Sequence, residues 1–143
     1  MQRVLMATDG SEGADRALAA AAELAKATGS ELLIVNAEQG YLSENLETMR
    51  QAENASIDEI LFAVSAEILT RAQARASELG VTKIRTFAGL GDAVGFILEI
   101  AKKEQPDMIV VGRRGRGRIM GLLIGSVSQK LVSLAPCKVL VVP

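Results

Sequence analysis

The stretch Met108-Ile109-Val110-Val111-Gly112-Arg113-Arg114-Gly115, followed after nine further residues by Gly125-Ser126, carries the clearest structural signal in this chain. The apolar run predicts a buried strand, the glycines predict a tight loop, and Gly125-Ser126 predicts the start of a helix. A helix N-terminus presents unpaired backbone N–H groups and a partial positive charge, and glycine lets an anion approach the backbone. This layout predicts a phosphate-binding site in an α/β protein.

The rest of the chain repeats the alternation of strand and helix. Continuous apolar runs predict buried strands at residues 4–7, 32–35, 108–111 and 139–142, and residues 83–88 predict a weaker strand with Ile84 and Phe87 as its larger apolar residues. Stretches with helical spacing lie between them, and we predict that they end at Gly29, Gly80, Pro106 and Pro136. Residues 89–92 are predicted to form a turn into the helix that ends before Pro106. We therefore predict an α/β fold: a single doubly wound domain over residues 1–143, with a five-stranded parallel sheet and helices on both faces.

The helical pattern over residues 43–79 is too long for one ordinary crossover helix. Its polar first part, residues 44–56, is interpreted as a separate helix or a mobile segment. Because the core does not explain this polar pattern, we hypothesise that residues 41–56 select a partner.

Two turns are expected to meet at one edge of the sheet. Residues 8–11 follow the first strand and residues 112–117 follow the fourth. In doubly wound sheets, ligands bind beyond the carboxyl ends of the strands, where the strand order reverses. If the first and fourth strands are neighbours, both turns face the same crevice.

Composition narrows the possible chemistry. The 143 residues are 49% hydrophobic and carry a net charge of −1, which is typical of an ordered globular domain. Four arginines nevertheless cluster near the glycine loop and indicate either a local anion-binding field or a solvated loop: Arg113, Arg114, Arg116 and Arg118.

Two residue types are nearly or wholly missing. The sequence contains no histidine, which excludes Ser-His-Asp and Cys-His nucleophile activation and histidine-based zinc sites. Its single cysteine, Cys137, excludes a disulfide framework and is interpreted as a buried structural thiol. Without an apolar run of 18 residues or a signal-peptide layout, we expect a cytoplasmic protein with no membrane span.

The glycine loop matches neither common phosphate-binding pattern. A Walker A loop requires Gly-Lys-Ser/Thr, which the sequence lacks, and Gly89-Leu90-Gly91 is not continued to a dinucleotide fingerprint. A flavin or nicotinamide oxidoreductase is therefore disfavoured, and a mononucleotide loop of another family remains.

The spacing Gly112-x-x-Gly115-x9-Gly125-Ser126 resembles the ATP-binding signature of the universal stress protein family. Residues 8–11 resemble the first loop of that family, and residues 135–142 resemble its end; the similarity is weakest over residues 38–79. The resemblance implies an adenine nucleotide alpha hydrolase-like fold and a nucleotide-binding member of the family.

The same resemblance implies a set of site residues. Asp9 matches the acidic residue near the ribose and phosphates and would also contact a magnesium ion, and Ala37 falls in the region that lines the adenine pocket. The remaining implied contacts to ATP are Thr8, Gly112, Arg113, Gly115, Arg116, Gly125, Ser126, Val127 and Ser128.

Each assignment has a purely structural alternative. Asp9 could cap the first helix with Glu12 as partner, and Ser126 could cap the last helix without a ligand. Gly125 could serve close packing, Ser128 could be a solvated helix residue, and Gly115 could belong to a flexible loop.

The last strand carries a second expectation. A Val-Leu-Val-Val run at a sheet edge is an association hazard unless it is covered, or protected by the neighbouring Lys138 and Pro143. The family resemblance implies that residues 139–142 pair antiparallel with a second copy to form a homodimer. We therefore expect a cytoplasmic ATP-binding, nucleotide-responsive homodimer with at most slow hydrolysis or autophosphorylation, or alternatively a module that binds AMP, a cyclic nucleotide or no nucleotide.

Overall fold

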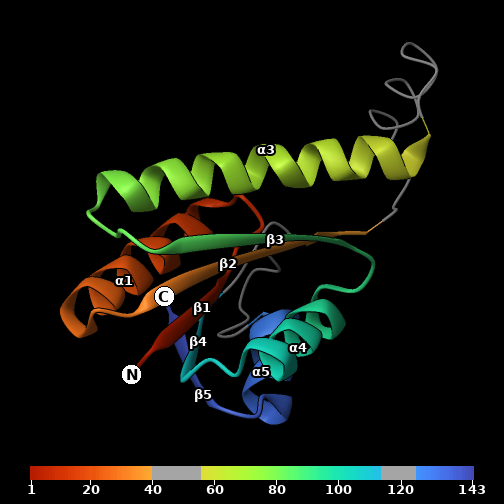
Figure 1. The fold of residues 1–143 in the computed structure, drawn as a ribbon. Helices are drawn as coiled ribbons and strands as arrows, with labels where there is room; N and C mark the ends of the chain where they lie inside the picture. Colours follow the sequence, from red (N-terminus) through yellow and green to blue (C-terminus); the bar gives the residue numbers. More distant parts are fainter. Residues whose placement is uncertain (40–55, 114–124) are drawn as a thin grey trace.

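A computed structural model describes residues 1–39, 56–113 and 125–143. Figure 1 shows a twisted sheet with helices on both of its faces. The strands are β1 (Arg3–Ala7), β2 (Glu31–Glu38), β3 (Ile84–Leu90), β4 (Met108–Gly112) and β5 (Lys138–Val142). The described helices are α1 (Glu12–Thr28), α3 (Ile57–Glu78), α4 (Ala93–Glu104) and α5 (Ser126–Leu134).

All the strands are parallel and follow the order β3-β2-β1-β4-β5. The predicted fold class is confirmed, and β1 and β4 are the neighbours between which the strand order reverses. Met6 lies opposite Ile34 of β2 on one side and Val110 of β4 on the other. The two turns singled out from the sequence therefore leave the sheet from adjacent strands.

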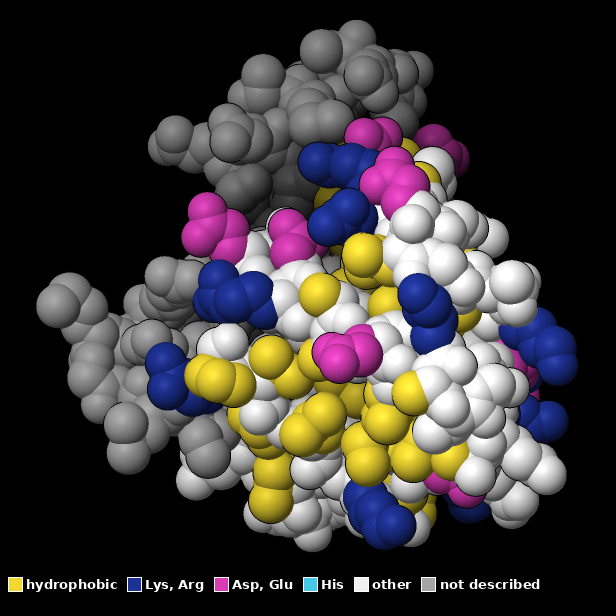
Figure 2. Space-filling model, turned by 90° about the vertical axis from the view of Figure 1, so that its left-hand side faces the viewer, with side chains coloured by type: hydrophobic (Ala, Val, Ile, Leu, Met, Phe, Trp, Pro, Cys, Tyr) yellow, Lys and Arg dark blue, Asp and Glu magenta, His cyan; other side chains and the backbone are white. Residues whose placement is uncertain are grey.

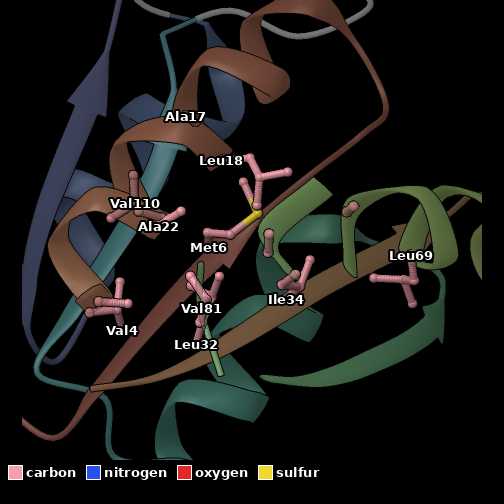
Figure 3. Close-up of a cluster of buried hydrophobic side chains, with 14 residues drawn as sticks. Val4, Met6, Ala17, Leu18, Ala22, Leu32, Ile34, Leu69, Val81 and Val110 are labelled. Atoms are coloured by element: carbon pink, nitrogen blue, oxygen red, sulfur yellow. The ribbon is translucent and has the colours of Figure 1, made fainter. Parts of the chain in front are cut away.

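The continuous apolar runs arise because alternate residues enter two separate cores. Val4 and Met6 join the cluster beneath α1 and α3, where Figure 3 shows Met6 directed toward Leu18. Leu5 joins the cluster on the opposite face of the sheet, which α4 and α5 cover, together with Leu131. Both faces of the central strands are thus buried away from solvent, as expected for a parallel sheet.

The predicted helix ends agree with the structure. Gly29 adopts the left-handed conformation as the C-cap of α1, at φ 66°. Helix α4 ends at Glu104, and Gln105 takes the same cap position before Pro106. Helix α3 begins at Ile57 with Ser56 as N-cap, so most of the predicted polar segment falls on residues 40–55, outside the described part of the chain.

Two predicted boundaries are wrong: β2 continues past the predicted residues 32–35 to Glu38, so that Ala37 lies within the strand, and the turn predicted over residues 89–92 begins later than expected. Gly89 and Leu90 belong to β3 rather than to the following turn, which is confined to Gly91 and Asp92. A Cβ at position 89 would lie 2.6 Å from the ring of Phe96 in α4. Glycine at this position leaves room for the Phe96 ring on the strand, and a larger residue would displace that ring; local turn chemistry contains no sign of this contact.

Candidate functional site

The carboxyl ends of β1 and β4 lie side by side, and the loop after β1 is tightly ordered. The Thr8 N–H continues the sheet by donating to the Val35 carbonyl at 2.9 Å. The Gly10 N–H donates to Thr8 Oγ1 at 3.1 Å, and the Ser11 N–H donates to Asp9 Oδ1 at 2.9 Å. The loop therefore holds the Asp9 carboxylate in a defined orientation at the sheet edge.

Asp9 is not the cap of the first helix. The N-cap of α1 is Ser11, whose Oγ accepts from the Ala14 N–H at 3.2 Å. The alternative in which Asp9 caps α1 with Glu12 as partner is therefore wrong, because Ser11 already fills the cap position.

Gly112 ends β4 against the first turn of α1. A Cβ at this position would lie 2.9 Å from the Gly13 carbonyl oxygen and 3.0 Å from the Gly13 carbonyl carbon. Backbone atoms do not move aside as the end of a flexible side chain would, so only glycine lets β4 and α1 approach this closely. Gly112 thus brings the two loops together by packing.

Arg113 links the end of β4 to both β5 and α5. Its N–H donates to the Val142 carbonyl at 2.7 Å, and its carbonyl accepts from the Gly125 N–H at 2.6 Å and from Ser128 Oγ at 2.9 Å. Its side-chain Nε is buried and has no hydrogen-bond partner among residues 1–39, 56–113 and 125–143. A guanidinium N–H can only donate, so this buried donor calls for an acceptor.

Helix α5 begins without a side-chain cap. Its N-cap is Gly125, which corrects the alternative that Ser126 caps the helix. The other described helices, α1, α3 and α4, are capped by side chains of Ser11, Ser56 and Asp92. The first-turn N–H groups of α5 therefore lack the side-chain acceptor that these helices possess.

Ser128, in the first turn of α5, is 2% exposed, so the interpretation of it as a solvated residue is wrong. Its hydroxyl donates to Arg113 O and also lies 3.1 Å from Gly125 O. Ser128 therefore ties the start of α5 to the end of β4.

The end of β2 borders the same edge. Ala37 is partly buried and pairs with Gly89 of β3. Two polar neighbours of Ala37 are buried: Asn36 is 2% exposed and Glu38 is 6% exposed. Sequence patterns did not single out Asn36, although a carboxamide inside an otherwise apolar strand is an unusual residue that invites attention.

The structure thus brings together the ends of β1, β2 and β4 with the start of α5. These elements hold most of the predicted contacts: Thr8, Asp9, Ala37, Gly112, Arg113, Gly125, Ser126, Val127 and Ser128. Gly115 and Arg116 lie outside the described residues. Within the described ranges, no group of three His, Cys, Asp or Glu side chains is placed to hold a metal ion by itself.

A charged network of described residues lies at the opposite, amino edge of the sheet. Arg85 Nη2 lies 2.8 Å from both Glu31 Oε1 and Glu104 Oε2. Hydrogen bonds from Arg85 are the main reason that the pKa values of both carboxyls are lowered. The N–H groups of Arg3 and then Gln2 lower the pKa of Asp107. This network joins strand ends and lies away from the candidate site.

No helix among residues 1–39, 56–113 and 125–143 combines the length and apolar character that crossing a bilayer requires.

Comparisons with known proteins agree with this fold. Residues 1–143 match the Universal stress protein family. The chain is 37% identical to Universal stress protein YxiE of Bacillus subtilis (strain 168), across 98% of this chain and 97% of that relative. It is similar to a crystal structure of a universal stress protein in complex with cAMP, with 28% identity, a TM-score of 0.77, and coverage of 99% of this chain and 97% of that one.

A universal stress protein from Archaeoglobus fulgidus in complex with dAMP shares the fold, with a TM-score of 0.69 at 20% identity over 100% of this chain and 98% of that one. The family match, the identity to YxiE and the common architecture agree across nearly the whole chain. The chain therefore belongs to the universal stress protein family.

Proposed function

We propose that this protein binds ATP with Mg²⁺ at the carboxyl edge of β1 and β4, and acts as a nucleotide-responsive cytoplasmic homodimer in a stress or signalling response. The observation that carries the proposal is the start of α5, where Gly125 leaves the first turn without a side-chain cap. The N–H groups of Ser126, Val127 and Ser128 would hold the terminal phosphates. A helix N-terminus favours such an anion through these N–H groups and the helix dipole.

Arg113 supports an anionic ligand independently. Its buried Nε lacks an acceptor among the described residues, and its backbone is bonded to Gly125 and Val142. A buried N–H donor without an acceptor costs free energy, which a phosphate oxygen would recover. The predicted loop contacts Gly115 and Arg116 would add to the same anion-binding field.

The other end of the nucleotide would meet the ends of β1 and β2. Asp9, oriented by the Ser11 N–H, would accept a ribose hydroxyl or contact the magnesium ion, and Thr8 would border the phosphates. The partly buried Ala37 would line the adenine pocket. Bound Mg²⁺ would neutralise part of the triphosphate charge, and the sequence offers no histidine as a base. We expect hydrolysis or autophosphorylation to be slow at most.

Replacement of Gly125 tests this site. Gly125 has φ −72° and ψ 166°, a conformation open to any residue, so Gly125→Val should fold normally. Its side chain would stand where the phosphates approach α5, and we expect MgATP affinity in calorimetry to fall at least about tenfold. Gln129→Val, one turn further along the exposed side of α5, is the matched control and should bind as the original protein does. Equal affinity of Gly125→Val and Gln129→Val would refute the site.

A second candidate function is binding of AMP or a cyclic nucleotide by the same site. It is favoured by the similar structures whose ligands are cAMP and dAMP. A ligand that binds only the folded state raises the melting temperature with its concentration. Thermal-shift titration with ATP, AMP and cAMP would rank them, and no shift with any of them would favour an interaction module that binds no nucleotide.

The homodimer is proposed to form through β5. This strand is the last in the sheet order, and Leu140 is 39% exposed on it. Figure 2 shows hydrophobic side chains gathered on the lower part of one face, at the height where Figure 1 places β5, α4 and α5. Antiparallel pairing with β5 of a second copy would provide hydrogen-bond partners for the backbone N–H and C=O groups at this edge of the sheet. It would also bury apolar surface in an interface that uses the same patch on both copies.

A further inference from the structure

Asn36 is a buried carboxamide in a strand that is otherwise suited to apolar residues. It follows Ile34 and Val35 in β2 and is 2% exposed. Its Nδ2 donates to the Thr8 carbonyl at 2.8 Å and lies 3.3 Å from Glu38 Oε1. Its Oδ1 is buried and has no partner in the described part of the chain.

Stability of the core does not explain this residue. A buried amide oxygen without a donor costs free energy, whereas an apolar side chain of the same size would avoid that cost. The neighbouring core between α3 and the sheet is formed by apolar side chains, including those of Leu32, Ile34 and Leu69. What distinguishes Asn36 from an apolar residue is its one short hydrogen bond, which it donates to the Thr8 carbonyl in the loop after β1.

That hydrogen bond completes the attachment of Thr8 to β2. The Thr8 N–H donates to Val35 O, and the Thr8 carbonyl accepts from Asn36, so both sides of this residue are held by β2. Thr8 Oγ1 then accepts from the Gly10 N–H, and Asp9 accepts from the Ser11 N–H. The path of the loop beyond β1 therefore depends on a side chain of the adjacent strand.

We infer that Asn36 is a positioning residue of the candidate site, which holds Thr8 so that the Asp9 carboxylate is presented to the ribose or to the metal of the nucleotide. The inference rests on the proposed function. Asn36 acts through Asp9 and does not itself contact the ligand. Its effect on binding therefore requires the carboxylate at position 9.

The test combines Asn36→Leu, which keeps the size of the side chain, with a double-mutant cycle against Asp9→Ala. Calorimetry with MgATP should show an affinity about tenfold weaker for Asn36→Leu than for the original protein. In the Asp9→Ala background, Asn36→Leu should cause no further loss, because coupled residues are not additive. Ser65→Ala is the matched control: its hydroxyl is fully buried and lies 3.5 Å from Asn36 O, but it does not hold Thr8.

Hydrogen exchange of the ligand-free protein provides the second measurement. In Asn36→Leu, the Gly10 and Ser11 N–H groups should exchange about tenfold faster or more, while those of Val4 to Met6 stay protected. Asn36→Val gives the same comparison if the leucine variant does not fold. Unchanged exchange at Gly10 and Ser11, or equal losses of affinity with and without Asp9, would overturn the role of Asn36. If the original protein binds no nucleotide while the loop loosens as expected, the proposed function fails and the loop-positioning role of Asn36 stands.

Discussion

A methyl group added at Gly112 should separate the end of β4 from the first turn of α1. It would lie 2.9 Å from Gly13 O and 3.0 Å from Gly13 C, whereas carbon atoms in favourable contact are about 3.5–4.0 Å apart. One backbone must therefore move by about 0.5 Å, and no rotamer change can relieve the contact. Overpacking of this kind costs about 1–3 kcal/mol, of which about 0.4–1 kcal/mol is offset by the lower entropy of the unfolded Ala chain.

The net loss for Gly112→Ala is then about 1.5 kcal/mol, which corresponds to a fall in Tm of about 3–6 °C for a domain of this size. Thermal unfolding followed by circular dichroism measures it. Gly95→Ala is the control, because its added methyl meets only side-chain atoms of Asp92, Oδ2 at 3.2 Å and Cβ at 3.9 Å, and α4 gains helix propensity. The packing argument would be refuted if the Tm of Gly112→Ala fell by less than about 1 °C, which is well below the expected shift. It would also be refuted if Gly95→Ala lowered the Tm more than Gly112→Ala does.

Three further outcomes are expected. Because Arg85 lowers the pKa values of Glu31 and Glu104, their contribution to stability is present above the usual value of 4.5 and is lost as the pH falls through the lowered values. Arg85→Met should therefore lower Tm at pH 6, and this difference from the original protein should shrink as the pH is lowered. Leu140→Glu should convert the proposed dimer to a monomer in analytical ultracentrifugation, because it places like charges on two paired edges. Burial raises the pKa of the half-buried Cys137 thiol, so maleimide should label it more slowly in the folded protein at pH 7 than in urea.

Each of these outcomes has its own control. Arg71→Met removes an exposed ion pair with Glu67, at 3.7 Å on α3, and should leave the pH dependence of Tm unchanged. Phe62→Glu alters an exposed apolar residue of α3 and should leave a β5 dimer intact. A Tm difference for Arg85→Met that does not shrink as the pH falls, a dimeric Leu140→Glu variant, or equal labelling rates of Cys137 in the folded and the unfolded protein would each contradict the corresponding argument.

Local sequence patterns predicted the strands, the helices and their order well. The continuous apolar runs identified the central strands β1, β2 and β4 because both of their faces are buried, as Leu5 and Met6 illustrate by entering opposite cores. Gly29 ended α1 as expected, since glycine tolerates the left-handed conformation at low cost. The alternation of strands and helices then implied right-handed crossovers and a binding edge at the carboxyl ends.

Details that depend on a neighbouring element were missed. Gly89 was predicted in a turn because glycine is common there, but it lies in β3, where it pairs with Ala37 of β2 and the Phe96 ring packs on it. Asp9 and Ser11 are both suitable caps by composition, and only the direction in which the chain leaves β1 gives the cap position to Ser11.

The spacing of glycines and the order of apolar runs belong to the chain itself, because strand, loop and helix are formed by residues close in sequence. They were sufficient to predict a doubly wound sheet and a phosphate-binding loop. The contacts that shape the candidate site join distant residues: Asn36 holds Thr8 across 28 positions, and Gly112 meets Gly13 of α1. Such contacts exist only after β1, β2 and β4 have paired and α1 has packed on them, so no local pattern records them.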